Sequence, residues 1–376
     1  MNRSSWFQRF LLPGFAFKAV VIGGGYATGR ELAEFFVPAG PRGGLLAMGL
    51  AMGLFSLICV VTFLFARMTG SADYRAFFRN LLGRFWILFE AAYVFFFILI
   101  LAVYGAAAGA IGEAMFGWPL LAGVLCLVAA IAAFTAFGNV SVEWLFKYAS
   151  YFLYGVYALF VYFALTRFGG RVAEGLATHA GTGGWALAGA TYASYNIIGA
   201  VVILPVLRHL TSTRDAVIAG LLAGPLAIIP AFLFFLCMIA WYPEIGGQAL
   251  PADFMLRQLG LPLLHGAFQL MIFFALLQSS VSAVHAINER IAGYLAERHQ
   301  RGFPPVGRLA CTIVLLVVAI FFAQRFGLVA LIAKGYRALA WMFLIVYALP
   351  LLTYGAWRLF RGRTHSSGTH TVETAP

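Results

Sequence analysis

The chain has 376 residues, of which 62% are hydrophobic and 10% are charged, and its mean hydropathy is +0.91. Soluble domains carry about 25% charged residues, so the composition excludes a soluble protein and indicates one embedded in a membrane. The formal net charge of +12 does not indicate a nucleic-acid partner. The basic residues gather at the ends of apolar segments, where they set the topology of a membrane protein.

The apolar segments predict ten transmembrane helices, because a helix needs about 20 residues to cross a bilayer. Their expected limits are 12–37, 44–67, 85–112, 118–138, 142–166, 185–207, 214–241, 260–291, 307–325 and 335–360. We expect one all-α transmembrane domain over residues 1–376, with a disordered polar tail at 364–376. The excess of Lys and Arg in alternate connections predicts a bacterial inner-membrane protein whose N- and C-termini are both cytoplasmic.

The first span is weakened near its middle by Gly23, Gly24, Gly25 and Gly29, because each glycine disfavours a helix. Charged residues follow at once, although charge is costly at this depth in a membrane. The pattern predicts a broken helix that presents its backbone to a ligand, and close helix packing is the alternative. The predicted solute contacts in this span are Gly23, Gly24, Gly25, Tyr26, Ala27 and Thr28. The backbone of Ile22 and Gly23 is predicted to contact the ion. The predicted gating residues are Lys18, Arg30 and Glu31, with Glu289 of the eighth span.

A second polar interruption falls five spans later, at Ser194, Tyr195 and Asn196 in the sixth span. A unit of five spans crosses the membrane an odd number of times, so its second copy must be inverted. We therefore predict a 5+5 inverted repeat, with one copy at 12–166, the other at 185–360, and helices one and six discontinuous. The match is one of pattern, without clear identity of residues between the halves.

The eighth span carries a polar stripe. Gln278, Ser282, His285 and Glu289 are four, three and four residues apart, so they share one helix face, with Ser279 beside them. We expect Gln278 to face the solute, Ser279 and Ser282 to ligate a cation, and His285 to take part in coupling. Hydrogen bonding between helices is the alternative.

Three ionisable residues lie in the half of the bundle predicted to be cytoplasmic, namely Lys18, Glu90 and Lys147. Charges buried in a membrane protein are usually paired, so we expect Glu90 to pair with Lys18 or Lys147 as a proton-coupling group or an inner gate. Lys147 could equally pair with Glu143, four residues before it. Tyr104 lies on the third span, where it could form a wall of the cavity.

The first-span segment Gly23-Gly24-Gly25-Tyr26-Ala27-Thr28-Gly29-Arg30-Glu31, with Phe35-Phe36, resembles the Gly-Ala-Gly-Phe-Ala-Ser-Gly-Gln-Glu motif of YkvI-like bacterial membrane proteins. Tyr195-Asn196-Ile197, with Val201-Val202 and Pro205-Val206, is similar to the sixth-span motif of that family. The resemblance implies the amino acid–polyamine–organocation superfamily and a LeuT-type fold, with substrate between broken helices one and six and with helices three and eight as walls. It also implies either a Na+ site at Ser279 and Ser282 or a replacement of that ion by Lys147. Arg30 departs from the usual Gln.

These observations predict a secondary active transporter, a symporter of an amino acid or a small amine coupled to H+ or Na+. The alternative is a ligand-sensing membrane receptor subunit of the same fold that does not transport. An enzyme is not indicated, since His285 is the one histidine clearly at depth and no Cys or His spacing suggests a metal site. We expect no cofactor other than Na+, a small-molecule substrate and the lipid bilayer as partners, and a monomer or homodimer.

Overall fold

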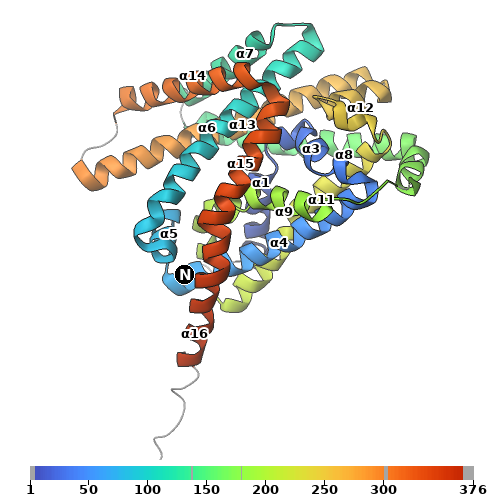
Figure 1. The fold of residues 1–376 in the computed structure, drawn as a ribbon. Coiled ribbons are helices and arrows are strands. Elements are labelled where there is room, and N and C mark those ends of the chain that lie inside the picture. Colours follow the sequence, from blue (N-terminus) through green and yellow to red (C-terminus); the bar gives the residue numbers. More distant parts are fainter. Residues whose placement is uncertain (1–4, 137–138, 179, 300–303, 367–376) are drawn as a thin grey trace, which may run out of the picture.

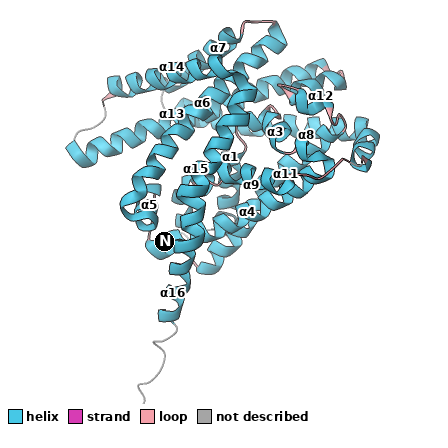
Figure 2. Cartoon of the chain, in the orientation of Figure 1, coloured by secondary structure: helices cyan, strands magenta, loops and turns pink. Residues whose placement is uncertain are grey.

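The computed structural model describes residues 5–136, 139–178, 180–299 and 304–366. Every regular element in these ranges is a helix, as Figure 2 shows. The predicted all-α class is therefore confirmed for the part of the chain that is described.

The first half of the chain contains one interrupted span and four long helices (Figure 1). In order, its elements are η1 (Phe7–Leu11), α1 (Leu12–Val21), α2 (Gly24–Ala27), α3 (Arg30–Phe35), η2 (Val37–Ala39), α4 (Gly40–Thr69), α5 (Tyr74–Leu82), η3 (Gly83–Phe85), α6 (Trp86–Phe116), α7 (Leu120–Ala136) and α8 (Asn139–Ala177).

The second half again begins with a short, interrupted span. Its elements are α9 (Trp185–Asn196), α10 (Gly199–Val202), η4 (Leu204–His209), α11 (Thr213–Ile239), η5 (Glu244–Gly247), α12 (Pro251–Leu259), α13 (Pro262–His299), α14 (Pro305–Ala330), η6 (Leu331–Tyr336), α15 (Arg337–Phe343), η7 (Leu344–Ala348), η8 (Leu351–Gly355) and α16 (Ala356–Ser366).

Local sequence signals explain several helix ends. The Asp73 carboxylate accepts from the Ala76 backbone N–H at 2.9 Å and caps α5, as expected for an acidic N-cap. Ser212 caps α11 in the same way, accepting from the Asp215 backbone N–H at 3.1 Å. Helices α4 and α6 end at Gly70 and Gly117, whose φ angles of +63° and +66° suit a residue without a Cβ.

Within the described residues, six stretches are long and apolar enough to cross a membrane, namely Arg30–Thr69, Tyr74–Phe116, Tyr151–Ala177, Thr213–Ile239, Pro262–Gly293 and Val306–Arg361. Several predicted spans correspond closely to observed helices, such as 85–112 to α6 and 214–241 to α11. The last stretch is bent where Gly327 leaves helical geometry, at φ +70° and ψ 170°. The chain is a multi-pass membrane protein, and the count of ten spans stays a prediction.

The helices pack as two sets. Helix α4 packs against α9 and α11, and α1 packs against α11. In the other set, α6 packs against α7, α13 and α14. Figure 1 shows the first set at the lower right and the second at the upper left. We call them the first and the second helix set, and the short helix α2 contacts α6 and α13 of the second set.

Close approach of backbones holds the first helix set together. An ideal Cβ on Gly220 of α11 would lie 2.6 Å from the Val60 backbone nitrogen and 2.7 Å from the Val60 Cα of α4. A Cβ on Gly189 of α9 would overlap the Ala47 carbonyl oxygen on the same helix α4. Small residues that allow such close contact are typical of helix interfaces in membranes.

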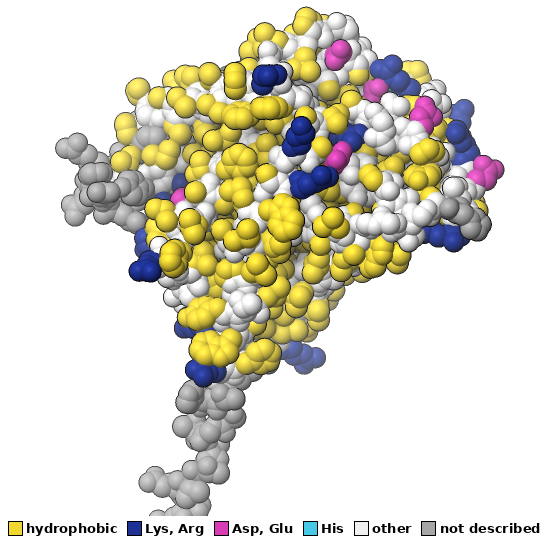
Figure 3. All heavy atoms as spheres, viewed as in Figure 1, with side chains coloured by type: hydrophobic (Ala, Val, Ile, Leu, Met, Phe, Trp, Pro, Cys, Tyr) yellow, Lys and Arg dark blue, Asp and Glu magenta, His cyan; other side chains and the backbone are white. Residues whose placement is uncertain are grey.

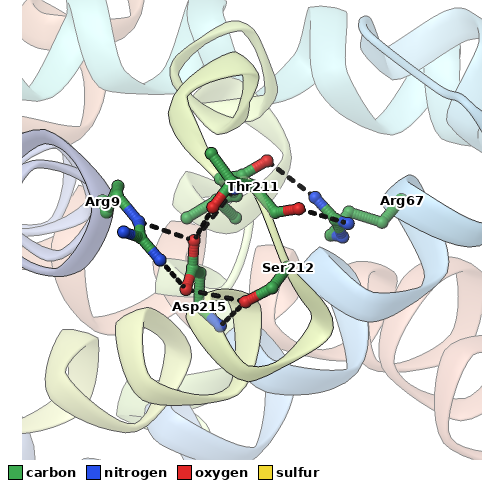
Figure 4. A network of polar contacts seen from close by, with 6 residues as sticks. Arg9, Arg67, Thr211, Ser212 and Asp215 are labelled. Carbon is green, nitrogen blue, oxygen red and sulfur yellow. Dashed lines mark hydrogen bonds and ion pairs between the residues drawn. The ribbon is translucent and has the colours of Figure 1, made fainter. Parts of the chain in front are cut away.

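A polar network joins the predicted cytoplasmic ends of this set (Figure 4). Arg9 donates two hydrogen bonds to the buried Asp215 carboxylate, at 2.9 Å and 2.7 Å. Asp215 also accepts from the Thr211 backbone N–H, the Thr211 hydroxyl and the Ser212 hydroxyl. Arg67 of α4 donates to the Leu210 carbonyl oxygen at 2.7 Å. The network therefore ties the start of span one to α4 and to the connection between η4 and α11.

The surface agrees with a membrane location. Figure 3 shows hydrophobic side chains over much of the lower and middle part of the visible face, with charged side chains across its upper centre and upper right and at its lower left and bottom edges. Such a belt between two charged ends is the surface that a bilayer requires.

Candidate functional site

The first span is interrupted where the glycines predict it. Helix α1 ends at Val21, Ile22 has φ −84° and ψ 79°, and Gly23 is extended at φ −94° and ψ −173°. A second interruption follows at Gly29, whose φ of +79° favours glycine. The predicted break at this place is confirmed, and it leaves the last carbonyl groups of α1 without partners inside their own helix.

The glycines after the break are needed because side chains of other helices contact their backbone. An ideal Cβ on Gly23 would lie 2.6 Å from the Tyr104 hydroxyl of α6, and one on Gly24 would lie 2.9 Å from the Tyr104 ring. A Cβ on Gly25 would overlap the Glu31 carboxylate and lie 3.3 Å from the Tyr336 hydroxyl. The broken span is therefore in direct contact with the residues that could bind a ligand.

Glu31 lies at the centre of this arrangement. The residue is buried, with only 3% of its surface exposed. The Tyr195 hydroxyl of α9 donates to its Oε2 atom at 2.7 Å, and the Tyr336 hydroxyl and the Tyr26 backbone also interact with the carboxylate. The rings of Tyr195 and Tyr336 lie 4.7 Å apart. Glu31, which the sequence suggested as a gating residue, is thus placed among the predicted solute contacts.

Arg30, the other residue of the predicted gating pair, points to a different place. Its guanidinium donates to the carbonyl oxygens of Gly246 and Gln248 at 2.9 Å and 2.8 Å, and it forms an ion pair with Glu34 at 2.7 Å. Arg337 also approaches Glu34, at 3.9 Å. We call Arg30, Glu34 and the Gly246 and Gln248 carbonyl groups the outer lock, because they tie α3 to the connection that follows α11 on the predicted outer side.

The second helix set contributes Tyr104 and Ser279. The Tyr104 hydroxyl lies close to the Ser279 side chain and to the Gly24 backbone. Helix α13 also places Leu276 against Gly24. The structure therefore brings the predicted residues Tyr104 and Ser279 together with the predicted break. Two further buried tyrosines, Tyr192 and Tyr336, were not predicted as site residues. Tyr336 lies far from the first span in the sequence, so no local pattern indicated it.

The remaining first-span residues serve the local backbone. The Thr28 hydroxyl donates to the Gly25 carbonyl oxygen at 2.8 Å, and the Thr28 carbonyl accepts from the Ala252 backbone N–H at 3.0 Å. Tyr26 and Ala27 are buried. The Tyr26 hydroxyl lies near Tyr157 of α8.

The interruption of the sixth span is milder than predicted. Helix α9 ends at Asn196, but Ile197 and Ile198 keep right-handed helical angles. The Ala200 and Val201 backbone N–H groups donate three residues back, at 3.0 Å each, so the helix tightens rather than unwinds.

Both polar side chains at this point bond within their own helix, Ser194 to the Ala190 carbonyl at 2.7 Å and Asn196 to the Tyr192 carbonyl at 3.0 Å. Such bonds four residues back satisfy a polar side chain locally. Tyr195 is thus the residue of this motif whose hydroxyl reaches the first span.

The residues of the polar stripe on α13 differ in their exposure. Gln278 is half-buried, whereas Ser282, His285 and Glu289 are exposed. Glu289 forms its ion pair with Arg308 of α14 at 2.6 Å, not with the neighbouring Arg290. Ser282, His285 and Glu289 are therefore exposed on one face of α13, and the cavity-facing role of the stripe stays a prediction.

The predicted pairing of Glu90 with Lys18 is wrong. Glu90 lies 3.6 Å from the Arg290 guanidinium, which lies over the rings of Tyr74 and Tyr93, 3.9 Å and 3.6 Å from their centroids. The Lys18 ammonium instead lies 4.4 Å from the Tyr154 ring centroid, a favourable position for a cation. Lys147 lies outside the residues whose side chains the structure describes.

No protein-family profile matches the chain, and no curated protein matches it in sequence. Solved transporter structures do match it. A manganese transporter mutant of Eremococcus coleocola is 15% identical, with a TM-score of 0.54 over 94% of this chain and 80% of that one. A Na+-coupled sialic acid symporter in a substrate-bound outward-open state is 13% identical, with a TM-score of 0.57 over 94% and 82%.

The inward-facing conformation of Mhp1 is 16% identical, with a TM-score of 0.51 over 91% of this chain and 76% of that one. These proteins have the LeuT-type fold. At such low identity the likeness establishes the fold, which confirms the predicted fold type. The narrower resemblance to YkvI-like proteins stays a prediction.

Proposed function

We propose that the protein is a secondary active transporter of a small polar solute, an amino acid or a small amine, coupled to H+ or Na+. The observation that carries the proposal is the interrupted first span, whose glycine backbone contacts Tyr104 and the buried Glu31 carboxylate. Interrupted helices near the middle of a membrane commonly form the substrate site of such transporters.

The position of the site between the two helix sets supports alternating access. Gly23, Gly24 and Gly25 belong to the first span, which packs with the first set, while Tyr104 and Ser279 come from the second. A movement of one set against the other would open the site to one side and then the other. The polar network at Asp215 connects members of the first set to each other, as a body that moves as one unit requires.

The substrates of the compared structures do not carry over directly. Manganese is the cargo named for one neighbour, and among the described residues no group of three or more His, Cys, Asp and Glu is placed to hold a metal ion. Tyrosine hydroxyls, backbone groups and a single carboxylate are suited to an organic solute with polar groups. We further propose cytoplasmic termini and membership of the YkvI-like family, from the charge distribution and motifs described above.

Uptake by purified protein in proteoliposomes tests the function. A panel of amino acids and small amines is offered under imposed H+ and Na+ gradients, and at least one solute is expected to accumulate in a saturable, gradient-dependent way. Saturable binding without uptake under any gradient would contradict the proposal and favour a ligand-sensing receptor subunit.

Gly25→Ala tests the site itself. The added Cβ must displace the Glu31 carboxylate, and overpacking of this kind costs about 1–3 kcal/mol. Uptake is expected to fall by roughly one to two orders of magnitude. Gly53→Ala is the matched control, because a Cβ on Gly53 meets nothing within 4 Å. Equal uptake by the two variants would contradict the assignment of Gly23–Gly25 to the solute site.

A further inference from the structure

Glu31 is a buried carboxylate without a basic partner. The residue is 3% exposed, and among the described residues no Lys or Arg lies within ion-pair distance of it. Its contacts are the Tyr195 and Tyr336 hydroxyls and the Tyr26 backbone. Hydrogen bonds from neutral donors orient the carboxylate but leave its charge uncompensated, and an uncompensated charge is costly in a low-dielectric interior.

Two basic residues of the first span are held elsewhere. Arg30 is bound in the outer lock by Glu34 and by two carbonyl groups. The Lys18 ammonium lies over the aromatic rings of Phe15 and Tyr154. Among the described side chains, which do not include Lys147, no cation balances the charge of Glu31. A cation from outside these residues would balance it when the site is closed.

The groups around Glu31 suit a cation. The titratable side chains that face it are tyrosines from four other elements, namely Tyr26 on α2, Tyr104 on α6, Tyr192 and Tyr195 on α9, and Tyr336 on η6. Their hydroxyls can accept hydrogen bonds as well as donate them, and aromatic rings attract cations. The end of α1 adds carbonyl groups at the negative end of its helix dipole.

We propose that Glu31 binds a proton and the ammonium group of a cationic solute in turn, so that the protein exchanges an amine for H+. This inference rests on the proposed transport function and names its solute class and its coupling ion. In the empty, closed site the carboxyl group carries a proton. When R–NH3+ binds, that proton leaves for the aqueous side to which the site is open, and the carboxylate forms a charge-assisted hydrogen bond with the ammonium.

Because Glu31 holds either a proton or an ammonium group but not both, the exchange of amine for H+ is obligatory. Closure with Glu31 ionised and unpaired is disfavoured by desolvation, so the site closes around either the proton or the amine. Each full cycle then moves one ammonium group in one direction and one proton in the other. A solute without net positive charge cannot replace the proton at this position.

The test measures proton release by purified protein in detergent, in a weakly buffered solution with a pH indicator. The probes are 1,4-diaminobutane and butylamine, and the comparison compounds, which carry no ammonium group or no net positive organic charge, are 1,4-butanediol, alanine and NaCl. We expect the amines to release protons from the wild-type protein and the other probes to release none. The apparent Kd for 1,4-diaminobutane should rise about tenfold per pH unit as the pH falls through the range in which Glu31 takes up its proton.

Glu31→Gln is expected to abolish proton release and the pH dependence of binding, while Glu31→Asp retains both if the variant protein is folded. Glu174→Gln, at an exposed position on α8, is the matched control and should behave as wild type. Unchanged proton release in Glu31→Gln, or release by NaCl but not by the amines, would overturn the proposal.

The proteoliposome assay separates this inference from the proposed function. If a neutral or zwitterionic solute accumulates while no amine releases protons, the amine exchange is refuted and transport stands. If no solute accumulates at all, the transport function itself is refuted.

Discussion

Gly220 gives a quantitative test of how the first helix set is packed. An alanine Cβ at this position would lie 2.6 Å from the Val60 backbone nitrogen and 2.7 Å from the Val60 Cα. Comfortable contacts between such atoms are about 3.5 Å or longer, so Gly220→Ala must push α11 away from α4 by roughly 1 Å. Because both contacts are with backbone, no side-chain rotation can relieve them, and we expect a destabilisation of about 1–3 kcal/mol.

Gly53→Ala makes the same chemical change on α4 where a Cβ meets nothing within 4 Å. Removing a glycine from an open helix position stabilises the helix by about 0.5–1 kcal/mol. The two variants should therefore change stability in opposite directions. Thermal unfolding of both proteins, followed by tryptophan fluorescence in one detergent and at one scan rate, should rank Gly53→Ala at or above wild type and Gly220→Ala below it. A Gly220→Ala protein that melts with or above wild type would refute the close packing of α4 and α11.

Three further predictions concern charged residues. Asp215→Asn should lower thermal stability, because the carboxylate accepts five hydrogen bonds, and adding Arg9→Ala should then lower it little further; independent, additive losses would contradict their pairing. Arg290→Lys should cost about 1–2 kcal/mol in unfolding measurements, since a lysine lacks the planar guanidinium that contacts both tyrosine rings, and a neutral result would argue against these contacts. Arg30→Ala should accelerate hydrogen exchange at residues 244–250, because Arg30 holds the Gly246 and Gln248 carbonyls in this connection, whereas protection equal to wild type would show that the outer lock does not hold it.

The interruption of the first span could be predicted because its cause is local. Gly23, Gly24 and Gly25 weaken the helix wherever the rest of the chain lies, and the break appears at that point. The sixth span lacks such glycines next to Asn196, and its residues Ile197 and Ile198 remain helical. A polar side chain can satisfy itself four residues back, so polarity alone does not unwind a helix.

The partners of charged residues could not be predicted in the same way. Glu90 is paired with Arg290, 200 positions further along the chain, and Tyr336 reaches Glu31 from the last span. Both contacts depend on how helices from the two halves pack, which periodicity within one helix does not encode. Spacing placed Ser282, His285 and Glu289 correctly on one face of α13, but it could not determine which way that face points.

Helix α2 is a four-residue segment with an interruption on each side, at Ile22–Gly23 and at Thr28–Gly29. Torsion about a few backbone bonds at these two joints can therefore reorient α1 without breaking the hydrogen bonds inside either neighbouring helix. The Asp215 network ties the start of span one to α11, and the outer lock ties α3 to the connection that follows α11, so a change of angle at these joints alters how the two parts of the span pack on α11. The residues that contact Tyr104 and Glu31 lie at these joints, which is where a bound solute would act on the angle between the two parts.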